Sequence, residues 1–185
     1  MLGGEGLAMV TKMAILNANY LASSFEKLGF KILFKGSKGR VGHEMIWDCN
    51  MFNKEYGISE LDIAKRLMDF GFHAPTLSFP VHGTLMKEEL DRFIEALKTI
   101  REEMIEVGEG KADKTDNVLK NAPHTHKVLT ADEWSHAYLR SKAAYPLAWV
   151  AENKFWPQVG RVDDGYGDRN LMCTCDPLES YTDEK

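Results

Sequence analysis

The stretch ISELDIAKRLMDFG, residues 58–71, carries the signals of one amphipathic helix with both ends defined locally. Ser59 can cap the amides of the first turn, and Asp62 can answer as the third residue of a capping box. Gly71 supplies a stop at the other end, because glycine readily adopts the left-handed conformation that terminates helices. The stretch therefore predicts a helix that begins directly after Ser59 and ends before Gly71.

Helical periodicity recurs on both sides of this stretch. Apolar residues three or four apart predict one long helix over residues 7–28 and another over residues 87–107. KILFKG (31–36) and VGHEMIWDCN (41–50) are rich in strand formers and predict a β-hairpin. FHAPTLSFPVHGTLM (72–86) predicts two short strands around a turn, because its prolines exclude a helix. The fold class that follows is α/β.

The composition of the chain changes after Gly108 and predicts three parts. Residues 1–28 form a linker helix, residues 29–107 a small α/β domain, and residues 108–185 an aromatic-rich tail. The tail holds three of the four tryptophans and four of the six prolines, with little periodicity. Its aromatic side chains carry large apolar surfaces. We therefore expect the tail to wrap over another surface, since it cannot easily form a core of its own.

Charge and composition exclude several classes of protein. The net charge is -5 and the basic residues are dispersed, so we expect neither nucleic-acid binding nor a polybasic membrane patch. No apolar run approaches the roughly 20 residues of a membrane-spanning helix, and MLGGEGLAMVTK at the start lacks the regions of a secretory signal. Three cysteines without disulfide spacing are typical of a reducing compartment. A globular protein of the bacterial cytosol or the mitochondrial matrix is expected.

The best candidates for metal ligands are two pairs, His124 with His126 and Cys173 with Cys175. Within each pair a single residue intervenes, whereas compact zinc sites usually place two to four residues between ligands. The spacing favours structural histidines and ordinary free thiols. We predict no metal site, and a small metal-binding protein remains an alternative that rests on these pairs alone.

No self-contained catalytic set is visible in the sequence. There is no G-x-S-x-G elbow, and no lysine stands in a context typical of a Schiff base. His73 follows a predicted helix end beside Pro75 and Thr76, in the kind of loop that often carries ligand contacts. A lone histidine is nevertheless more often structural. The residues alone indicate an α/β domain with an aromatic tail and a role in assembly.

Five ordered segments, spanning nearly the whole chain, closely resemble the end of glycine dehydrogenase (decarboxylating), the P-protein family of the glycine cleavage system. They are AILNANYLA (14–22), DIAKRLMDFGFHAPTLSFPVHGTLM (62–86), EELDRF (88–93), LKNAPHT (119–125) and NKFWPQVGRVDDGYGDRNLMCTC (153–175). Any one of the short segments would be a weak match. Five in the same order make chance similarity implausible.

The resemblance implies a fold and an activity. The fold would be the small carboxy-terminal domain of an aspartate-aminotransferase-like (fold type I) pyridoxal-phosphate enzyme, with an extended wrapping tail. The complete enzyme would use pyridoxal phosphate to release CO2 from glycine and would pass the aminomethyl group to the lipoyl arm of the H-protein. It would act as a homodimer or as paired subunits. The cofactor would supply the chemistry, and the protein would position and tune it.

The resemblance also limits what can be assigned to this chain. The cofactor lysine of the family lies in an upstream domain, and no position here matches it, so the chain alone is expected to be inactive and to carry no catalytic residue. His73, Thr76 and Thr84 are candidate neighbours of the active site. Relatives continue after GTLM with a segment of the type VEPTESES, which is missing between Met86 and Lys87. The alternative function is a non-catalytic assembly module that docks through its aromatic tail.

Overall fold

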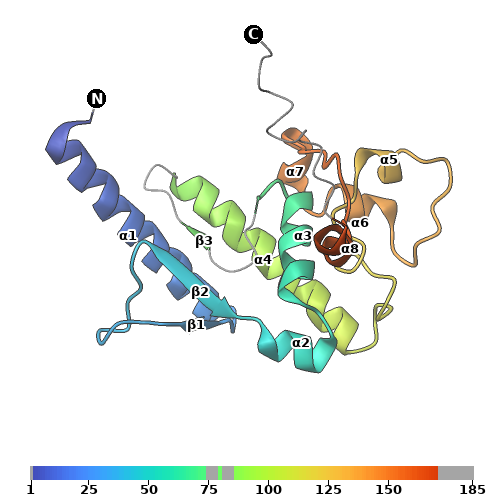
Figure 1. Ribbon diagram of the computed structural model, residues 1–185, viewed down its shortest axis with the longest axis horizontal. Coiled ribbons are helices and arrows are strands. Elements are labelled where there is room, and N and C mark those ends of the chain that lie inside the picture. The colour runs from blue at the N-terminus through green and yellow to red at the C-terminus, as the bar shows by residue number, and fades with distance from the viewer. Residues whose placement is uncertain (1, 74–78, 81–85, 171–185) are drawn as a thin grey trace, which may run out of the picture.

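The computed structural model describes residues 2–73, 79–80 and 86–170. Figure 1 shows α1 on one side of the molecule, the short helices of the tail on the other, and α4 between them. The elements in chain order are α1 (Gly3–Lys27), β1 (Lys31–Leu33), β2 (Glu44–Asp48), α2 (Asn50–Tyr56), α3 (Glu60–Asp69), β3 (Phe79–Pro80), α4 (Lys87–Gly108), α5 (His126–Leu129), α6 (Arg140–Ala144), α7 (Ala148–Glu152) and α8 (Asp164–Arg169). The architecture is a mixed arrangement of helices and a small sheet, as an α/β prediction requires. The relationship to fold type I stays a prediction.

Both predicted ends of α3 are confirmed. The Ser59 hydroxyl accepts a hydrogen bond from the Asp62 amide at 3.2 Å, and the Asp62 carboxylate accepts one from the Ser59 amide at 2.8 Å. These reciprocal bonds satisfy two amides that the first turn leaves without helical partners. At the other end Gly71 has a φ of 89°, which places it in the left-handed region. Local chemistry therefore fixes the length of α3.

The predicted hairpin is confirmed, with shorter strands. β1 pairs antiparallel with β2, and Ile32 lies opposite Trp47. β3 pairs with the other side of β2, so the sheet order is β1-β2-β3. Pro80 lies in β3 at the edge of this sheet, where a missing amide is tolerated. The remainder of the segment predicted as two strands, residues 74–78 and 81–85, lies outside the described residues.

Within the predicted domain of residues 29–107, the short helix α2 was not expected. The second hairpin strand was predicted to run to Asn50, but β2 ends at Asp48 and Asn50 is the first residue of α2. α2 spans seven residues and contributes only Phe52 to the buried set. It ends at Gly57, whose φ of 68° provides a left-handed cap. Because α2 is short and buries a single side chain, it has no apolar stripe that sequence periodicity could reveal.

The main core lies between α1, the sheet, α3 and α4. Phe25 of α1 is at its centre, with its ring centroid 4.8 Å from that of Trp47 and 5.7 Å from that of Phe93. The other buried apolar residues of this core include Ala18, Leu21, Phe30, Ile32, Met45, Ile63, Leu67, Leu90, Leu97, Ile100 and Met104. The long periodic helices predicted around residues 7–28 and 87–107 are confirmed as α1 and α4. Each contributes one apolar stripe to this core.

The tail folds back onto the domain, and it is less extended than expected. Val118, Leu119 and Val150 join the main core. The tail up to residue 170 also carries four short helices and a second small cluster, in which Leu129, Ala143 and Ala144 are buried against Trp134, Tyr138 and Trp156. The expectation of an extended tail without its own core is therefore wrong for this part. The three-part division at residues 28 and 107 stays a prediction. Among the described residues, no helix is both long and apolar enough to cross a membrane.

Candidate functional site

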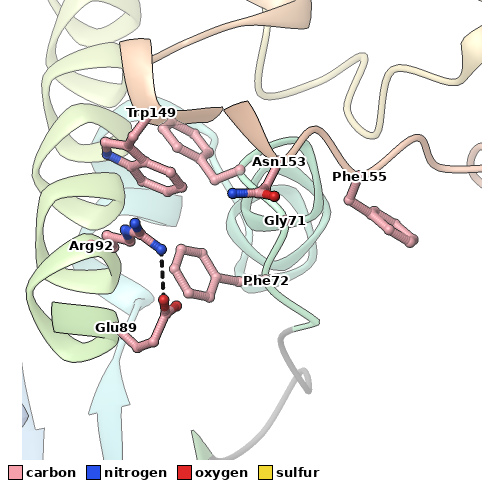
Figure 2. Close-up of a pocket in the computed structure, with 8 residues that line it drawn as sticks. Gly71, Phe72, Glu89, Arg92, Trp149, Asn153 and Phe155 are labelled. Carbon is pink, nitrogen blue, oxygen red and sulfur yellow. Dashed lines mark hydrogen bonds and ion pairs between the residues drawn. The ribbon is translucent and has the colours of Figure 1, made fainter. Parts of the chain in front are cut away.

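A pocket of about 310 Å³ opens between the end of α3, the first turns of α4, and α7 (Figure 2). Its lining combines aromatic rings with two charged side chains and consists of Phe70, Gly71, Phe72, Glu89, Arg92, Trp149, Asn153 and Phe155. These residues come from the α3 terminus, from α4 and from the tail. The pocket therefore exists only because the tail folds back onto the domain.

The end of α3 determines the aromatic wall of the pocket. The left-handed Gly71 turns the chain sharply, so that Phe70 is buried on one side of the turn and Phe72 is half-buried on the other. The Phe72 ring meets Phe93 edge-on at 5.1 Å and Trp149 edge-on at 6.1 Å. Edge-to-face contacts of this kind are favourable arrangements of aromatic quadrupoles. The α3 stop signal in the sequence thus positions one wall of the site.

The two charges of the pocket lie one turn apart on α4 and neutralise each other. Arg92 donates a hydrogen bond to Glu89 at 2.6 Å, and Figure 2 shows this pair beside Phe72. The Arg92 guanidinium also lies over the Trp149 ring, 5.8 Å from its centroid, and the Trp149 indole donates to Glu95 at 2.8 Å. The lining can hold and orient a partly apolar group. Among the described residues, the lining contains no lysine, histidine, cysteine or serine that could act as a nucleophile or base.

The three residues predicted as active-site neighbours are not brought together in the described part of the chain. His73 is exposed and directly follows Phe72, so it lies next to the pocket without lining it. Thr76 and Thr84 fall outside the described residues. Their role near an active site stays a prediction.

A buried ionic network is centred on Arg66, whose guanidinium lies 5.2 Å from the ring centroid of the pocket residue Phe70. Arg66 is fully buried and donates to both carboxylate oxygens of Glu103, from Nε at 3.0 Å and from Nη2 at 2.7 Å. Its Nη1 donates to Asp69 at 2.9 Å, and its remaining hydrogen bonds reach the main-chain oxygens of Lys142 and Ala143 in α6. Burial alone would lower the pKa of the guanidinium, but the two carboxylates outweigh burial and raise it. Arg66 therefore remains charged and ties α3 to α4 and to the tail.

Asp69 extends this network into the tail through His124. One oxygen of Asp69 accepts from the His124 amide at 2.7 Å, and the other lies 2.8 Å from Nδ1 of the imidazole. The opposite ring nitrogen, Nε2, lies 2.8 Å from the Tyr138 hydroxyl. Burial raises the pKa of Asp69, but the hydrogen bond from His124 and the charge of Arg66 outweigh it and lower the pKa overall. Burial also raises the pKa of Tyr138 to about 12.

The network explains His124, which the sequence suggested only as a candidate metal ligand. His124 is buried and hydrogen-bonded to Asp69 and Tyr138, whereas His126 is exposed at the start of α5, so the two side chains do not face a common site. Cys173 and Cys175 lie outside the described residues. Within the described ranges no group of three or more His, Cys, Asp or Glu side chains is arranged to hold a metal ion. The roles of Arg66, Asp69 and Glu103 were not predicted.

Comparison with known proteins places this arrangement in a class. A sequence model described as "Glycine dehydrogenase, C-terminal domain" matches residues 10–124, more than half of the chain. The class is thus a carboxy-terminal domain of a larger enzyme. Proteins named glycine dehydrogenase (decarboxylating) are similar over 98% of this chain, with 58% identity in Flavobacterium johnsoniae and 54% in both Akkermansia muciniphila and Bordetella avium. The chain belongs to the glycine dehydrogenase (decarboxylating) family.

The same comparisons show how this chain differs from its relatives. The chain spans about a fifth of the length of the curated relatives it matches. The aligned stretches cover 189 or 190 residues, more than the 185 of this chain, so the relatives carry residues that it lacks. Missing residues are what the predicted deletion after Met86 requires. The place in the chain where they are missing stays a prediction. The similarity also includes the tail beyond residue 124, where Trp149 and Phe155 complete the pocket.

Proposed function

We propose that this chain is the carboxy-terminal part of a pyridoxal-phosphate-dependent glycine decarboxylase, in which it provides a scaffold and one wall of the active-site region. The complete enzyme would release CO2 from glycine and transfer the aminomethyl group to the lipoyl arm of the H-protein. The observation that carries the proposal is the identity of 53 to 58% with glycine dehydrogenases over 98% of the chain. The pocket supports the scaffold role, because the lining residues that the structure describes offer packing and orientation without a reacting group.

The residues described here do not fit pyridoxal phosphate itself. Within residues 2–73, 79–80 and 86–170, the pocket lining contains no lysine that could bind the aldehyde, and the charge of Arg92 is already paired with Glu89. Lys154, whose neighbours Asn153 and Phe155 line the pocket, directs its ammonium to the main-chain oxygen of Asp69. In this proposal the cofactor is held by the part of the polypeptide that precedes the domain in the relatives. No chemical step is assigned to residues of this chain.

The proposal carries further predictions about partners and location. The substrate would be glycine, the second partner the lipoyl-carrying H-protein, and the assembly a homodimer or paired subunits. The compartment would be the cytosol in a bacterium or the mitochondrial matrix in a eukaryote. The alternative of an assembly module that docks through its aromatic tail is less well supported, because the tail tryptophans already have partners within the chain. Trp134 donates to the Tyr138 carbonyl, and Trp149 donates to Glu95.

A chimeric enzyme tests the proposed function. The matched carboxy-terminal stretch of the Flavobacterium johnsoniae relative would be replaced by this chain, once as it stands and once with a VEPTESES segment inserted between Met86 and Lys87. We expect both chimeras to fold and to retain the cofactor absorbance. The first should exchange the glycine carboxyl group with bicarbonate poorly, and the second should recover exchange in the presence of H-protein.

The unmodified relative serves as the positive control, and the isolated chain should show no exchange. A cofactor-loaded chimera that fails to exchange even with the segment restored would contradict the proposed function. Exchange by the isolated chain would contradict the scaffold role. Full exchange by the first chimera would show that the junction at Met86 is compatible with activity, and it would leave the assignment of the chain to this enzyme intact.

A further inference from the structure

Phe34 directly follows β1, where the connection to β2 begins, and it is held in an unfavourable state. Its side chain is 84% exposed, the largest value among the large apolar side chains that the structure describes. Its φ of 53° lies in the left-handed region, and no other residue with a Cβ within the described ranges has a positive φ. The exposure leaves an aromatic ring in water, and the φ strains the backbone. Strain of this kind persists mainly where it serves a contact or a function.

The connection between β1 and β2 holds Phe34 in a defined position. The Gly36 amide donates to the Arg40 carbonyl at 2.8 Å, which closes the connection on itself. Asn19 of α1 binds both main-chain groups of Val41, because its Oδ1 accepts from the amide at 3.1 Å and its Nδ2 donates to the carbonyl at 2.9 Å. The base of the connection is thereby fixed to α1, while every residue from Phe34 to Arg40 is exposed. A preorganised tip loses little conformational entropy when it binds.

The same connection is a local excess of positive charge. Between Glu26 and Glu44 the sequence contains five lysine and arginine residues and no aspartate or glutamate. The rest of the chain contains 18 basic and 28 acidic residues, a net charge of -10. Two of the five cations are paired with carboxylates, whereas Lys38 and Arg40 form no ion pair in the part of the chain that the structure describes. The tip therefore fits an acidic surface with an aromatic hollow.

The pocket at the end of α3 has the shape and the charge that such a tip requires. Its walls are mainly aromatic (Figure 2), and its volume of about 310 Å³ exceeds the roughly 150 Å³ that suffice for a benzene molecule. Its own charges, Glu89 and Arg92, are paired with each other. Three further carboxylates, all exposed, lie within one helical turn of Arg92 on α4 or directly beside Asn153 at the end of α7. They are Glu88, Glu95 and Glu152. Lys154 is the nearby cation, and its ammonium is directed to a main-chain oxygen.

Only a second copy of the chain can bring this tip and this pocket together. Figure 1 shows the connection between β1 and β2 on the opposite side of the molecule from α7, and its base is fixed to α1. A standard interface involves about 20 to 30 residues on each partner. One tip in one pocket falls short of this size, whereas a two-fold pair makes the same contact twice. We therefore expect a weak and reversible dimer.

We propose that two copies of this chain associate reciprocally, with Phe34 of each copy entering the pocket of the other. In this pair Lys38 and Arg40 lie against the exposed carboxylates beside the pocket, and the Phe34 ring packs against Phe72 and Trp149. The proposal goes beyond the proposed function, which expects paired subunits but assigns no contact between them. It is tested on the chain alone and without glycine exchange, so its failure and the failure of the proposed function are distinguishable.

Sedimentation of the chain tests this pair. From about 10 µM to about 1 mM, the dimer fraction of the parent should rise with concentration. Phe34→Asn removes the ring and keeps a residue that tolerates the left-handed conformation, and it should weaken association by about tenfold or more. Leu139→Asn is the matched control, since Leu139 is an apolar residue that is 73% exposed elsewhere on the chain, and it should associate like the parent.

Three outcomes of the sedimentation experiment would overturn the inference. The first is a parent that stays monomeric throughout this range. The second is a Phe34→Asn variant that associates as strongly as the parent, because another surface would then join the copies. The third is a series of species larger than a dimer, which a head-to-tail contact would produce and a reciprocal pair would not.

Charge reversal on both sides of the contact provides a second test. The variants K38E/R40E and E88K/E152K each place like charges against each other in a homodimer, so each should associate about tenfold more weakly than the parent or weaker still. In an equal mixture the reversed tip of one variant meets the reversed rim of the other, and both contacts become favourable again. The mixture should therefore recover the association of the parent. A mixture that remains as monomeric as the separate variants, while circular dichroism shows both to be folded, would overturn the inference.

Discussion

Lys154 donates a hydrogen bond of 2.7 Å from its side-chain nitrogen to the main-chain oxygen of Asp69, the last residue of α3. The contact joins residues 85 positions apart and fastens the tail beside the pocket. Burial lowers the pKa of Lys154 to about 8, because the surrounding protein solvates the ammonium less well than water does. Asp69 opposes this shift and Arg66 adds to it. The folded state thus binds a proton at Lys154 less readily than the unfolded state.

This depressed pKa predicts a specific pH dependence of stability. Between about pH 8 and the ordinary lysine value of 10.5, the unfolded chain holds more protons at this site than the folded chain, so stability rises with pH. Below pH 8 both states are protonated and the cost of burying the charge is fully present. We expect the free energy of unfolding of the parent, relative to Lys154→Met, to increase from pH 7.5 to pH 10. Urea unfolding at both values measures the difference, and a flat difference would contradict the shift.

Removing one partner of the buried Arg66–Glu103 pair should be strongly destabilising. Glu103→Gln keeps the size of the side chain but leaves the buried guanidinium with less compensating charge, and breaking such pairs typically costs about 3 to 5 kcal/mol. Glu106→Gln is the matched control, since Glu106 lies one turn further along α4 and forms an ion pair with Lys142 in which both side chains are partly exposed. It should cost less than about 1 kcal/mol. Denaturant midpoints of the two variants that differ by no more than experimental error would contradict this assignment.

Gly71→Ala should destabilise the chain through backbone conformation. A Cβ at this position would meet its nearest neighbour, Cβ of Phe155, at 3.9 Å, so there is room for it. The φ of 89° is nevertheless strained for alanine, at a cost of about 1 to 2 kcal/mol. Gly4→Ala, inside α1 with open space around it, should instead stabilise by about 0.5 to 1 kcal/mol. Thermal unfolding of both variants checks the opposite signs, and Trp149 fluorescence should change only in Gly71→Ala.

Asp62 should make stability sensitive to acid. Besides capping α3, its carboxylate lies 2.7 Å from the Lys120 ammonium and 2.8 Å from the Arg161 guanidinium. Burial raises its pKa, but Lys120 and the hydrogen bonds of Ser59 outweigh burial and hold the pKa below its usual value of 3.8. The stabilisation is therefore present above pH 3.8 and is lost as pH falls through the lower folded pKa. We expect the parent to be more stable than Asp62→Asn at pH 7, with the gap closing towards pH 2. A stability difference between parent and variant that stays constant with pH would show that the charge of Asp62 does not cause it.

The sequence was sufficient to predict those elements whose signals are local. Ser59, Asp62 and Gly71 define α3 at both ends, and long apolar stripes define α1 and α4. The ionic network left a partial signal, because Arg66 adjoins Leu67 on the buried face of α3 and Glu103 adjoins Met104 on that of α4. Charges on apolar stripes indicate a buried pair. Their mutual pairing depends on how the two helices cross, which one sequence does not reveal.

The pocket was harder to predict than the network. Phe72 and Trp149 are 77 positions apart, and the segment that brings Trp149 into place has no sustained periodicity. The sequence predicts an aromatic tail that packs on another surface. The short helices of the tail, however, depend on contacts with α3 and α4 more than on intrinsic helix propensity. Helices of four or five residues, such as α5 and α7, are too short to be stable alone. Their existence is a consequence of tertiary packing.

The contacts that the tail makes around Asp69 show that the folded unit is longer than the segment that the family model matches. A chain cut after residue 124 would keep every position that the family model matches. It would lose the Tyr138 hydroxyl beside His124, the α6 carbonyl groups that accept from Arg66, and the Lys154 bond to Asp69. Buried charges would then face solvent-filled space on one side of α3. The smallest piece that can be exchanged between these enzymes without damage therefore extends at least to Lys154.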